Sequence, residues 1–239
     1  MSDNRYTDLA NYYDCLMTSG YYDHAGYAQS LHHILAGRKN MLDLGVGTGL
    51  LVEQLLQLAD YQVTGVDFSP DMIRQAENRL RQYPVELVCQ DIQDYTSDKT
   101  FSSAVSLGGV FIFTYLPVEK QYRLYSYCLQ KQVCMTLLRK IYGLLKDSGV
   151  LCISLQHSRG NSDLLIRDNI NYSQQLTFSG NQAHKTYTFS RDGKILSEQT
   201  LTMRFFEETE YLSLFSSARF IASGLDDTGK FFVFRKAIA

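Results

Sequence analysis

Residues 41–50, MLDLGVGTGL, lead a short apolar run into a turn with three glycines, Gly45, Gly47 and Gly49. The apolar-rich segment LLVEQLLQL begins where this turn ends and predicts a helix. A strand that passes through glycines into a helix is typical of open α/β sheets, which bind their ligands at the carboxyl ends of the strands. This stretch therefore constrains both the fold of the chain and the position of its site.

Strands and helices alternate on both sides of the glycine turn. Apolar spacing predicts helices over 24–36 and 133–145, the second ending at 147–149, and Ser69 with Pro70 marks the start of another. Further strands are predicted in the segments YQVTGVDFS, VELVCQD, FSSAVSLGGVFIF and VLCISLQH. Because these strands are apolar on both faces, we expect a parallel sheet covered by helices.

The pattern changes after the last of these strands. Residues 172–204 alternate polar and apolar side chains, and Asp192-Gly193 predicts a hairpin turn between them. A short helix around 207–217 precedes the segments RFIASGL and FFVFRKA, which predict a second antiparallel pair. We expect the antiparallel strands to extend the edge of the sheet and to cover the carboxyl ends of its parallel strands.

Charge and composition narrow the class of function. The 239 residues carry a formal net charge of -2 without a large Lys or Arg cluster, so no nucleic-acid footprint is visible. No apolar run approaches a membrane span, and the polar N-terminal segment lacks a signal-peptide core. Five cysteines without a C-x-x-C indicate reduced packing residues. We expect a soluble, cytoplasmic protein that binds neither nucleic acid nor membranes.

The glycine turn matches neither of two common phosphate-binding patterns. The dinucleotide pattern G-x-G-x-x-G requires a glycine where this chain has Leu50, and no Gly-Lys-Ser or Gly-Lys-Thr follows for a phosphate loop. Asp43 argues further against a pyrophosphate, because its carboxylate would repel one. This acid instead suits a ligand with a positive charge and no phosphate.

Three further features lie where later strands end. Asp67 comes 22 residues after Gly45, close to the spacing at which an acid binds ribose hydroxyls. Asp91 follows the third strand and could accept from an exocyclic amine, while Ile92 packs against an aromatic base. The segment SLGG, residues 106–109, leaves backbone free for a polar partner. An adenosine with a cationic amino-acid tail fits all of these features.

Four motifs in order, LDLGVGTG, GVDFSPDMI, QDI and LLKDSGVLCISL, resemble those of the class I S-adenosylmethionine-dependent methyltransferases. The similarity runs from about residue 6 to residue 236. It implies an α/β fold with a Rossmann-like, mostly parallel sheet flanked by helices, an antiparallel C-terminal strand pair and a β lid. It also implies a single domain over 1–239, with an N-terminal helical cover at 1–36 and an antiparallel lid insertion at 160–205.

The resemblance assigns roles around the glycine turn, with S-adenosylmethionine as the cofactor. Gly45, Gly47 and Gly49 would form the bed for its methionine portion, and Asp43 would act on its ammonium group. Leu107, in the segment SLGG, would offer its backbone carbonyl to the methionine end.

The next two motifs imply contacts with the adenosine half of the cofactor. Asp67 would take the ribose hydroxyls, and Phe68 and Met72 would flank the adenine. Asp91 would face the adenine amine, beside Ile92.

The N-terminal segment and the fifth strand supply the remaining candidates. Tyr13, with Tyr22 or Tyr27, corresponds to tyrosines that lie near the cofactor carboxylate in the resembling enzymes. His157 ends the fifth strand and is the candidate general base or acceptor-orienting group, because an unperturbed histidine titrates near neutrality. Tyr22 could orient the acceptor instead, and an amine acceptor that arrives unprotonated needs no base.

These features predict methyl transfer to a nitrogen or oxygen of a small, aromatic or natural-product metabolite, by a monomer or homodimer. The segment QHSRGNSD after the fifth strand offers one acid and one histidine, so no metal is expected. The Pro-Pro signature of base-amine methyltransferases is absent from the sequence, since its three prolines are never adjacent. Three alternatives stay open: a non-catalytic cofactor-binding partner subunit, a nucleic-acid methyltransferase, and an enzyme that uses the sulfonium only electrostatically.

Overall fold

A parallel sheet forms the centre of the computed structural model, which describes residues 10–237. Its strands stand in the order β3-β2-β1-β4-β7, and every neighbouring pair among them is parallel. Their bounds are β1 Asn40–Leu44, β2 Gln62–Asp67, β3 Glu86–Cys89, β4 Phe101–Ser106 and β7 Leu145–His157. The side chains of Leu42 and Leu44 share one buried cluster, whereas Met41 lies in another. Both faces of the sheet are therefore covered, as the apolar strands predict.

The C-terminal strand pair completes this core on the far side of β7. Strand β13 (Phe231–Lys236) runs antiparallel to β7, and β12 (Phe220–Leu225) pairs with β13. Asp226 holds the turn between them, because its Oδ1 accepts from the backbone N–H groups of Lys230 and Phe231. The predicted antiparallel C-terminal pair is confirmed.

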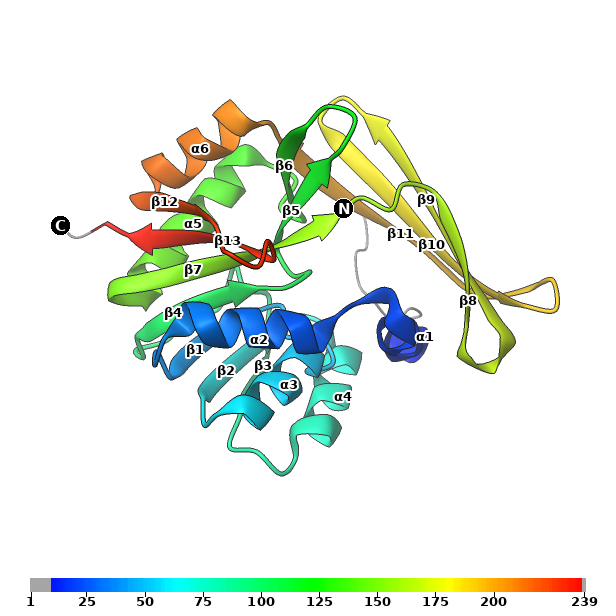
Figure 1. Ribbon diagram of the computed structural model, residues 1–239, viewed down its shortest axis with the longest axis horizontal. Helices are drawn as coiled ribbons and strands as arrows, with labels where there is room; N and C mark the ends of the chain where they lie inside the picture. Colours follow the sequence, from blue (N-terminus) through cyan, green and yellow to red (C-terminus); the bar gives the residue numbers. More distant parts are fainter. Residues whose placement is uncertain (1–9, 238–239) are drawn as a thin grey trace.

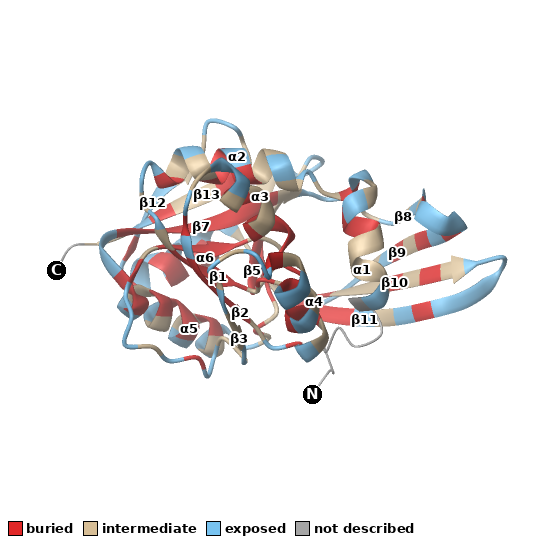
Figure 2. Cartoon of the chain, turned by 90° about the horizontal axis from the view of Figure 1, so that it is seen from below, coloured by how far each residue is buried: buried red, intermediate tan, exposed pale blue. Residues whose placement is uncertain are grey.

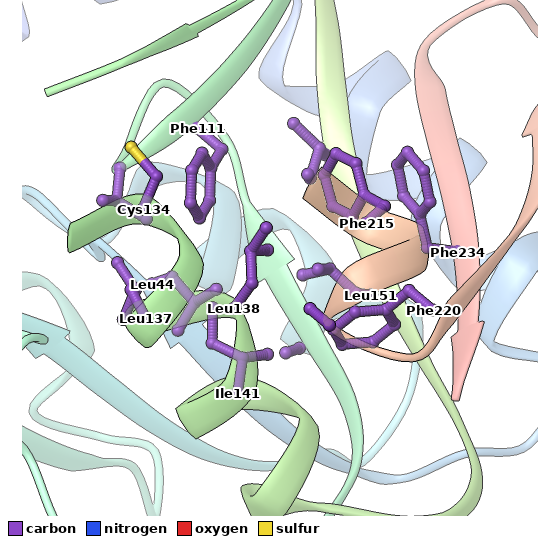
Figure 3. Close-up of a cluster of buried hydrophobic side chains, with 14 of the residues drawn as sticks. Leu44, Phe111, Cys134, Leu137, Leu138, Ile141, Leu151, Phe215, Phe220 and Phe234 are labelled. Atoms are coloured by element: carbon purple, nitrogen blue, oxygen red, sulfur yellow. The ribbon is translucent and has the colours of Figure 1, made fainter. Parts of the chain in front are cut away.

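Helices cover the two faces of the core (Figure 1). Helices α2 (His24–Leu35), α3 (Leu50–Leu58) and α4 (Pro70–Leu80) pack in one buried cluster, and α5 (Lys131–Leu144) and α6 (Glu208–Ser217) in the other. The second cluster is drawn in Figure 3, where Phe215 and Phe234 stack with ring centroids 3.8 Å apart. Local sequence sets the helix starts: the Ser69 hydroxyl accepts from the N–H of Met72 at α4, beside Pro70.

An antiparallel extension continues the sheet beyond the end of β7, in the order β5-β6-β11-β10-β9-β8. Strand β5 joins it to the core by pairing in parallel with the last residues of β7, where Tyr115 lies opposite His157. The bounds are β5 Phe111–Leu116, β6 Gln121–Ser126, β8 Ser162–Ile166, β9 Ile170–Ser179, β10 Gln182–Arg191 and β11 Lys194–Phe206, with a 3-10 turn at Arg167–Asn169. The Asp192-Gly193 hairpin turn is confirmed between β10 and β11.

The N-terminal segment packs against this extension. Helix α1 (Ala10–Leu16) and a π-helical turn (Met17–Tyr21) share a buried cluster with β9, β10 and β11, in which the Tyr12 ring stacks on Phe189 at 5.3 Å. Figure 2 shows the buried segments of these strands beside α1. No helix within residues 10–237 combines the length and the apolar character that crossing a membrane requires.

Two details of the sequence prediction were wrong. Residues 101–113 form two strands instead of one, because the chain turns at Gly108 and Gly109; a Cβ on Gly109 would lie 1.9 Å from the carbonyl oxygen of Leu44. The helix predicted to end at 147–149 ends at Leu144, and β7 begins with Leu145. The predicted Rossmann-like α/β fold is confirmed, but its antiparallel part is larger than expected because β5 and β6 belong to it.

Candidate functional site

The glycine turn after β1 lies against the turn between β4 and β5. Gly45 has a φ of 102°, and a Cβ there would lie 2.8 Å from the Cα of Gly109. Both backbones must therefore lack a side chain to approach this closely. Gly47, with a φ of 55°, has open space where its Cβ would stand. The turn thus presents bare backbone to the space above the sheet.

That space is a cavity of about 550 Å³ at the carboxyl ends of β1 to β4, within the usual range for small-molecule sites. Ten of the residues predicted to bind cofactor line it: Tyr13, Asp43, Gly45, Gly47, Asp67, Phe68, Met72, Asp91, Ile92 and Leu107. Gly49 is not among its walls, because it caps α3 and packs against Leu80. We call this space the first cavity.

Asp43 is a buried acid of the first cavity that forms no ion pair with the residues the structure describes. Its side chain is almost fully buried, and its Oδ1 has no hydrogen-bond partner among the residues the structure describes. Burial, and then the neighbouring carboxylate of Asp67, raise the pKa of Asp43 to about 7. A carboxylate held in this way is stabilised by a cationic group placed beside it.

The carboxylate of Asp67, at the end of β2, is held in place by backbone N–H groups of two turns. Its Oδ2 accepts from the N–H of Gly47 and its Oδ1 from the N–H of Ser69, each at 2.9 Å. Burial raises the pKa of Asp67, and these hydrogen bonds act against that shift. The backbone of Phe68 also donates to this carboxylate, and the remaining acceptor capacity of Asp67 is open to a hydroxyl group.

The other wall of the first cavity is mainly apolar. Met72 is buried, Ile92 is half-buried, and Phe68 remains 42 % exposed. Asp91 shapes the turn beside them, because its Oδ1 accepts from the N–H of Gln93 at 2.8 Å. A flat ring could lie between such side chains with a polar acceptor at its edge.

A second cavity of about 290 Å³ adjoins the first, and Tyr13, Gly108 and Tyr127 line both. The two candidate catalytic residues, Tyr22 and His157, lie here. The structure therefore brings Tyr22 and His157 to one cavity, which a shared wall separates from the cavity of the predicted cofactor residues.

Tyr22 and Tyr27 have different environments in the second cavity. The Tyr22 hydroxyl is buried and has no hydrogen-bond partner within residues 10–237; a Cβ on Gly108 would lie 3.9 Å from it. Burial, and then Tyr27, raise the pKa of Tyr22. The Tyr27 hydroxyl instead donates to the carbonyl of Leu155 at 2.6 Å, and Tyr27 lines only the second cavity. His157 is exposed at the end of β7.

The sequence reasoning missed one residue that lines the first cavity and one that supports its wall. His24 lines it and lies 5.3 Å from the Tyr22 ring; burial, and then Arg79, lower the pKa of His24 to about 4. Asp14 of α1 accepts from the Thr48 hydroxyl at 2.5 Å and pairs with Arg79 of α4. These contacts join distant segments, so no local motif could indicate them.

Comparison with known proteins shows which proteins the chain is similar to. Residues 41–131 match the family model of a methyltransferase domain. Over 70 residues the chain is 34% identical to a malonyl-acyl-carrier-protein O-methyltransferase of Acetivibrio thermocellus. This match covers 29% of this chain and 25% of the relative. Over 72 residues it is 33% identical to a tRNA1(Val) (adenine(37)-N6)-methyltransferase of Phocaeicola vulgatus. This match covers 28% of this chain and 31% of the relative. The chain thus spans about a quarter to a third of these curated relatives.

Solved structures match over nearly the whole chain. An S-adenosylmethionine-dependent methyltransferase from Clostridium acetobutylicum has a TM-score of 0.71 at 18% identity, with 98% of this chain and 99% of that chain covered. A sugar N-methyltransferase from Streptoalloteichus has a TM-score of 0.72 at 19% identity, with 95% and 93% covered. An amino pentose methyltransferase from Micromonospora echinaspora, solved with bound S-adenosylmethionine, has a TM-score of 0.70 at 18% identity, with 94% of this chain and 96% of that chain covered. Residues 41–131 thus resemble a methyltransferase domain, and the chain as a whole shares the fold of these S-adenosylmethionine-dependent methyltransferases.

Proposed function

We propose that the chain transfers a methyl group from S-adenosylmethionine to a nitrogen or oxygen of a small metabolite. The observation that carries this proposal is the pair of adjoining cavities, which share the wall formed by Tyr13, Gly108 and Tyr127. One cavity has the size and polar groups for the cofactor, and the other is large enough only for a small acceptor or part of one.

The first cavity fits the cofactor through its donors and acceptors. The buried, unpartnered Oδ1 of Asp43 would bind the ammonium group, and Asp67, with its remaining acceptor capacity, would accept from a ribose hydroxyl. Phe68, Met72 and Ile92 would enclose the adenine. When bound, S-adenosylmethionine supplies an electrophilic methyl group on a sulfonium, and the protein contributes alignment and exclusion of water.

The second cavity would hold and orient the acceptor. The Tyr22 hydroxyl has donor and acceptor capacity that no residue within 10–237 uses, so it can bond to the acceptor atom near Gly108. His157 at the rim can take a proton from a hydroxyl or an ammonium group as the acceptor becomes nucleophilic. We propose a single domain, in which the covers at 1–36 and 160–205 close this space from water; residues 1–9 of the first cover lie outside the described part of the chain.

A small acceptor is favoured over nucleic acid, although one relative is a tRNA methyltransferase. The chain has a net charge of -2, whereas proteins that bind nucleic acid present clustered positive charge to phosphates. The neighbours that methylate sugars are examples of small acceptors on this fold.

The test is incubation with methyl-labelled S-adenosylmethionine and a cell extract separated into small-molecule, protein and nucleic-acid fractions. We expect label in the small-molecule fraction with the wild type and with Asp60→Ala, an exposed acid outside both cavities, and much less with Asp67→Ala. Label in nucleic acid alone would identify a nucleic-acid methyltransferase. Binding of S-adenosylhomocysteine without any transfer would identify a non-catalytic binding subunit.

A further inference from the structure

We infer that the second cavity takes an acceptor that carries an anionic oxygen group, a carboxylate or a phosphate, bound by Lys185 and Arg159. This inference rests on the proposed function, because it names the chemical class of the acceptor for the same site. The sequence gives no hint of it, since the two cations are 26 residues apart on β10 and after β7.

Charge in the second cavity is unbalanced. Three permanent cations line it, Arg159, Lys185 and Lys230, against one acid, Asp23. The Lys230 ammonium is paired with Asp23 at 3.1 Å. Neither Arg159 nor Lys185 forms an ion pair with any residue between 10 and 237. Two positive charges therefore remain for an anionic ligand.

Both unpaired cations are held in place by tyrosines. The Arg159 guanidinium lies 4.4 Å from the centroid of the Tyr21 ring and donates to the Tyr21 carbonyl at 2.7 Å. The Lys185 ammonium lies 4.6 Å from the Tyr187 ring centroid and donates to the Tyr21 hydroxyl at 3.3 Å. These contacts orient the cations without neutralising them, and each cation keeps unused N–H donors.

A buried network fixes the tyrosine that both cations touch. The Tyr21 and Tyr172 hydroxyls each donate to the Oε1 of Gln174 at 2.8 Å. Gln174 is buried, and its Nε2 donates to the carbonyl of Gly160 at 2.5 Å, next to Arg159. The position of the cations is therefore set before the ligand arrives, which lowers the entropic cost of binding.

The geometry divides the acceptor into two parts. Its anionic group would lie with Lys185 and Arg159 against Tyr21, and its nucleophilic atom would lie near Gly108, where the cavities meet and the Tyr22 hydroxyl is buried. An acceptor with only a cationic amine would be repelled by the two unpaired charges. Binding energy from the anionic end would then serve to align the reacting end.

The experiment titrates three probes of similar size by calorimetry: phenyl phosphate, benzoate and neutral benzyl alcohol. Each is added to the wild-type protein with and without S-adenosylhomocysteine. We expect phenyl phosphate or benzoate to bind at least about tenfold more tightly than benzyl alcohol, as a hydrogen-bonded charge pair implies. The tighter of the two anions distinguishes a phosphate-bearing from a carboxylate-bearing acceptor.

Lys185→Met keeps the length of the side chain and removes its charge, and it should abolish the preference for anions. Arg159→Gln, at an exposed position, leaves the hydrogen bonds among Tyr21, Tyr172 and Gln174 in place and should weaken the preference for anions. Lys194→Met, on the exposed hairpin of the same sheet, is the matched control and should bind like the wild type. Equal affinity for all three probes, or no binding of either anion, overturns the inference. Failure of S-adenosylhomocysteine to bind in the same series overturns the proposed function instead.

Discussion

The two cavities are built from the chain in opposite ways. The first is lined mainly by short, consecutive stretches at the ends of successive parallel strands, within 43–51, 66–72, 90–93 and 107–110. The second gathers side chains from the N-terminal segment, from β5 and β6, from the end of β7 and from the strands β9 to β11. The first is acidic, through Asp43 and Asp67, and the second is basic.

The opposite charges of the two cavities fit the two proposed ligands. An acidic cavity favours a cofactor with an ammonium and a sulfonium, and a basic one favours an anionic acceptor, so neither ligand is attracted to the wrong place. The shared wall is mainly tyrosine and glycine, which adds no charge between them. Changes in one cavity should therefore leave binding in the other largely intact, and the following predictions test that separation.

The largest effect is expected for His157→Ala in the second cavity. Removal of a general base should lower turnover about 10²–10⁴-fold at saturating cofactor, while affinity for S-adenosylhomocysteine stays unchanged. Steady-state kinetics and calorimetry measure the two quantities. His33→Ala, an exposed histidine on α2, is the control. Turnover within a few-fold of wild type would remove His157 from the mechanism and leave alignment and desolvation to explain the rate.

The next effect belongs to the first cavity. Asp67→Ala should weaken binding of S-adenosylhomocysteine by about 1.5–3 kcal/mol, the range for hydrogen bonds to a charged group. Affinity for an acceptor probe should not change, because Asp67 does not line the second cavity. Calorimetry with Asp60→Ala as control measures both. Unchanged cofactor affinity would show that Asp67 does not bind the ribose, and a parallel loss of acceptor binding would break the separation of the cavities.

Asp43 should make cofactor affinity depend on pH. Its pKa of about 7 means that the carboxyl is protonated below neutrality and must ionise to bind an ammonium group. Affinity for S-adenosylhomocysteine should rise about tenfold between about pH 6 and pH 8 in the wild type. It should stay flat in Asp43→Asn, and Asp60→Asn should follow the wild type.

The same pKa fixes the sign of a stability effect. The folded-state pKa of Asp43 is about 7, above the ordinary value of 3.8. At a pH between these two values the folded protein therefore holds a proton that the unfolded chain has lost. This contribution to the free energy of unfolding is therefore present at low pH and is lost as pH rises through about 7. Thermal unfolding of Asp43→Asn should lack this slope. A slope identical to that of the wild type would contradict a raised pKa at Asp43.

The first cavity could be predicted from the sequence because its parts are local. Asp43 and Gly45 lie in one motif, Asp67 ends the next strand, and a parallel sheet brings all strand ends to the same edge. Ten predicted residues accordingly meet in one cavity. Their contacts with cofactor remain predictions.

The second cavity could be predicted only in part. Tyr22 and His157 were identified by their places in the N-terminal segment and at a strand end, but Lys185 and Arg159 were not, because the antiparallel pairing of β9 to β11 brings Lys185 near Tyr21. Tyr27 was placed near the cofactor, whereas its hydroxyl is bonded to Leu155. Long-range pairing of this kind leaves no periodic signal in a single sequence.

The smallest effect concerns the cover predicted at 1–27 and 160–205. Asp14 of α1 bonds to Thr48 of the glycine turn and to Arg79, while Tyr12 of the same helix stacks on Phe189 of the lid. Helix α1 therefore connects the first cavity to the lid. With cofactor and acceptor bound, hydrogen exchange should slow over the covers predicted at 1–27 and 160–205, of which residues 1–9 lie outside the described part of the chain.

Asp14→Ala should remove part of this protection. The loss of about 1 kcal/mol from a half-buried polar contact should speed exchange in residues 10–21 about fivefold, without altering exchange in the parallel core. Asp163→Ala, an exposed acid on β8, should leave the covers as slow as in the wild type. Mass spectrometry of exchange in peptides from both segments measures the effect. Equal exchange with and without ligands in the wild type would refute closure, and the two cavities would then be open to solvent throughout the reaction.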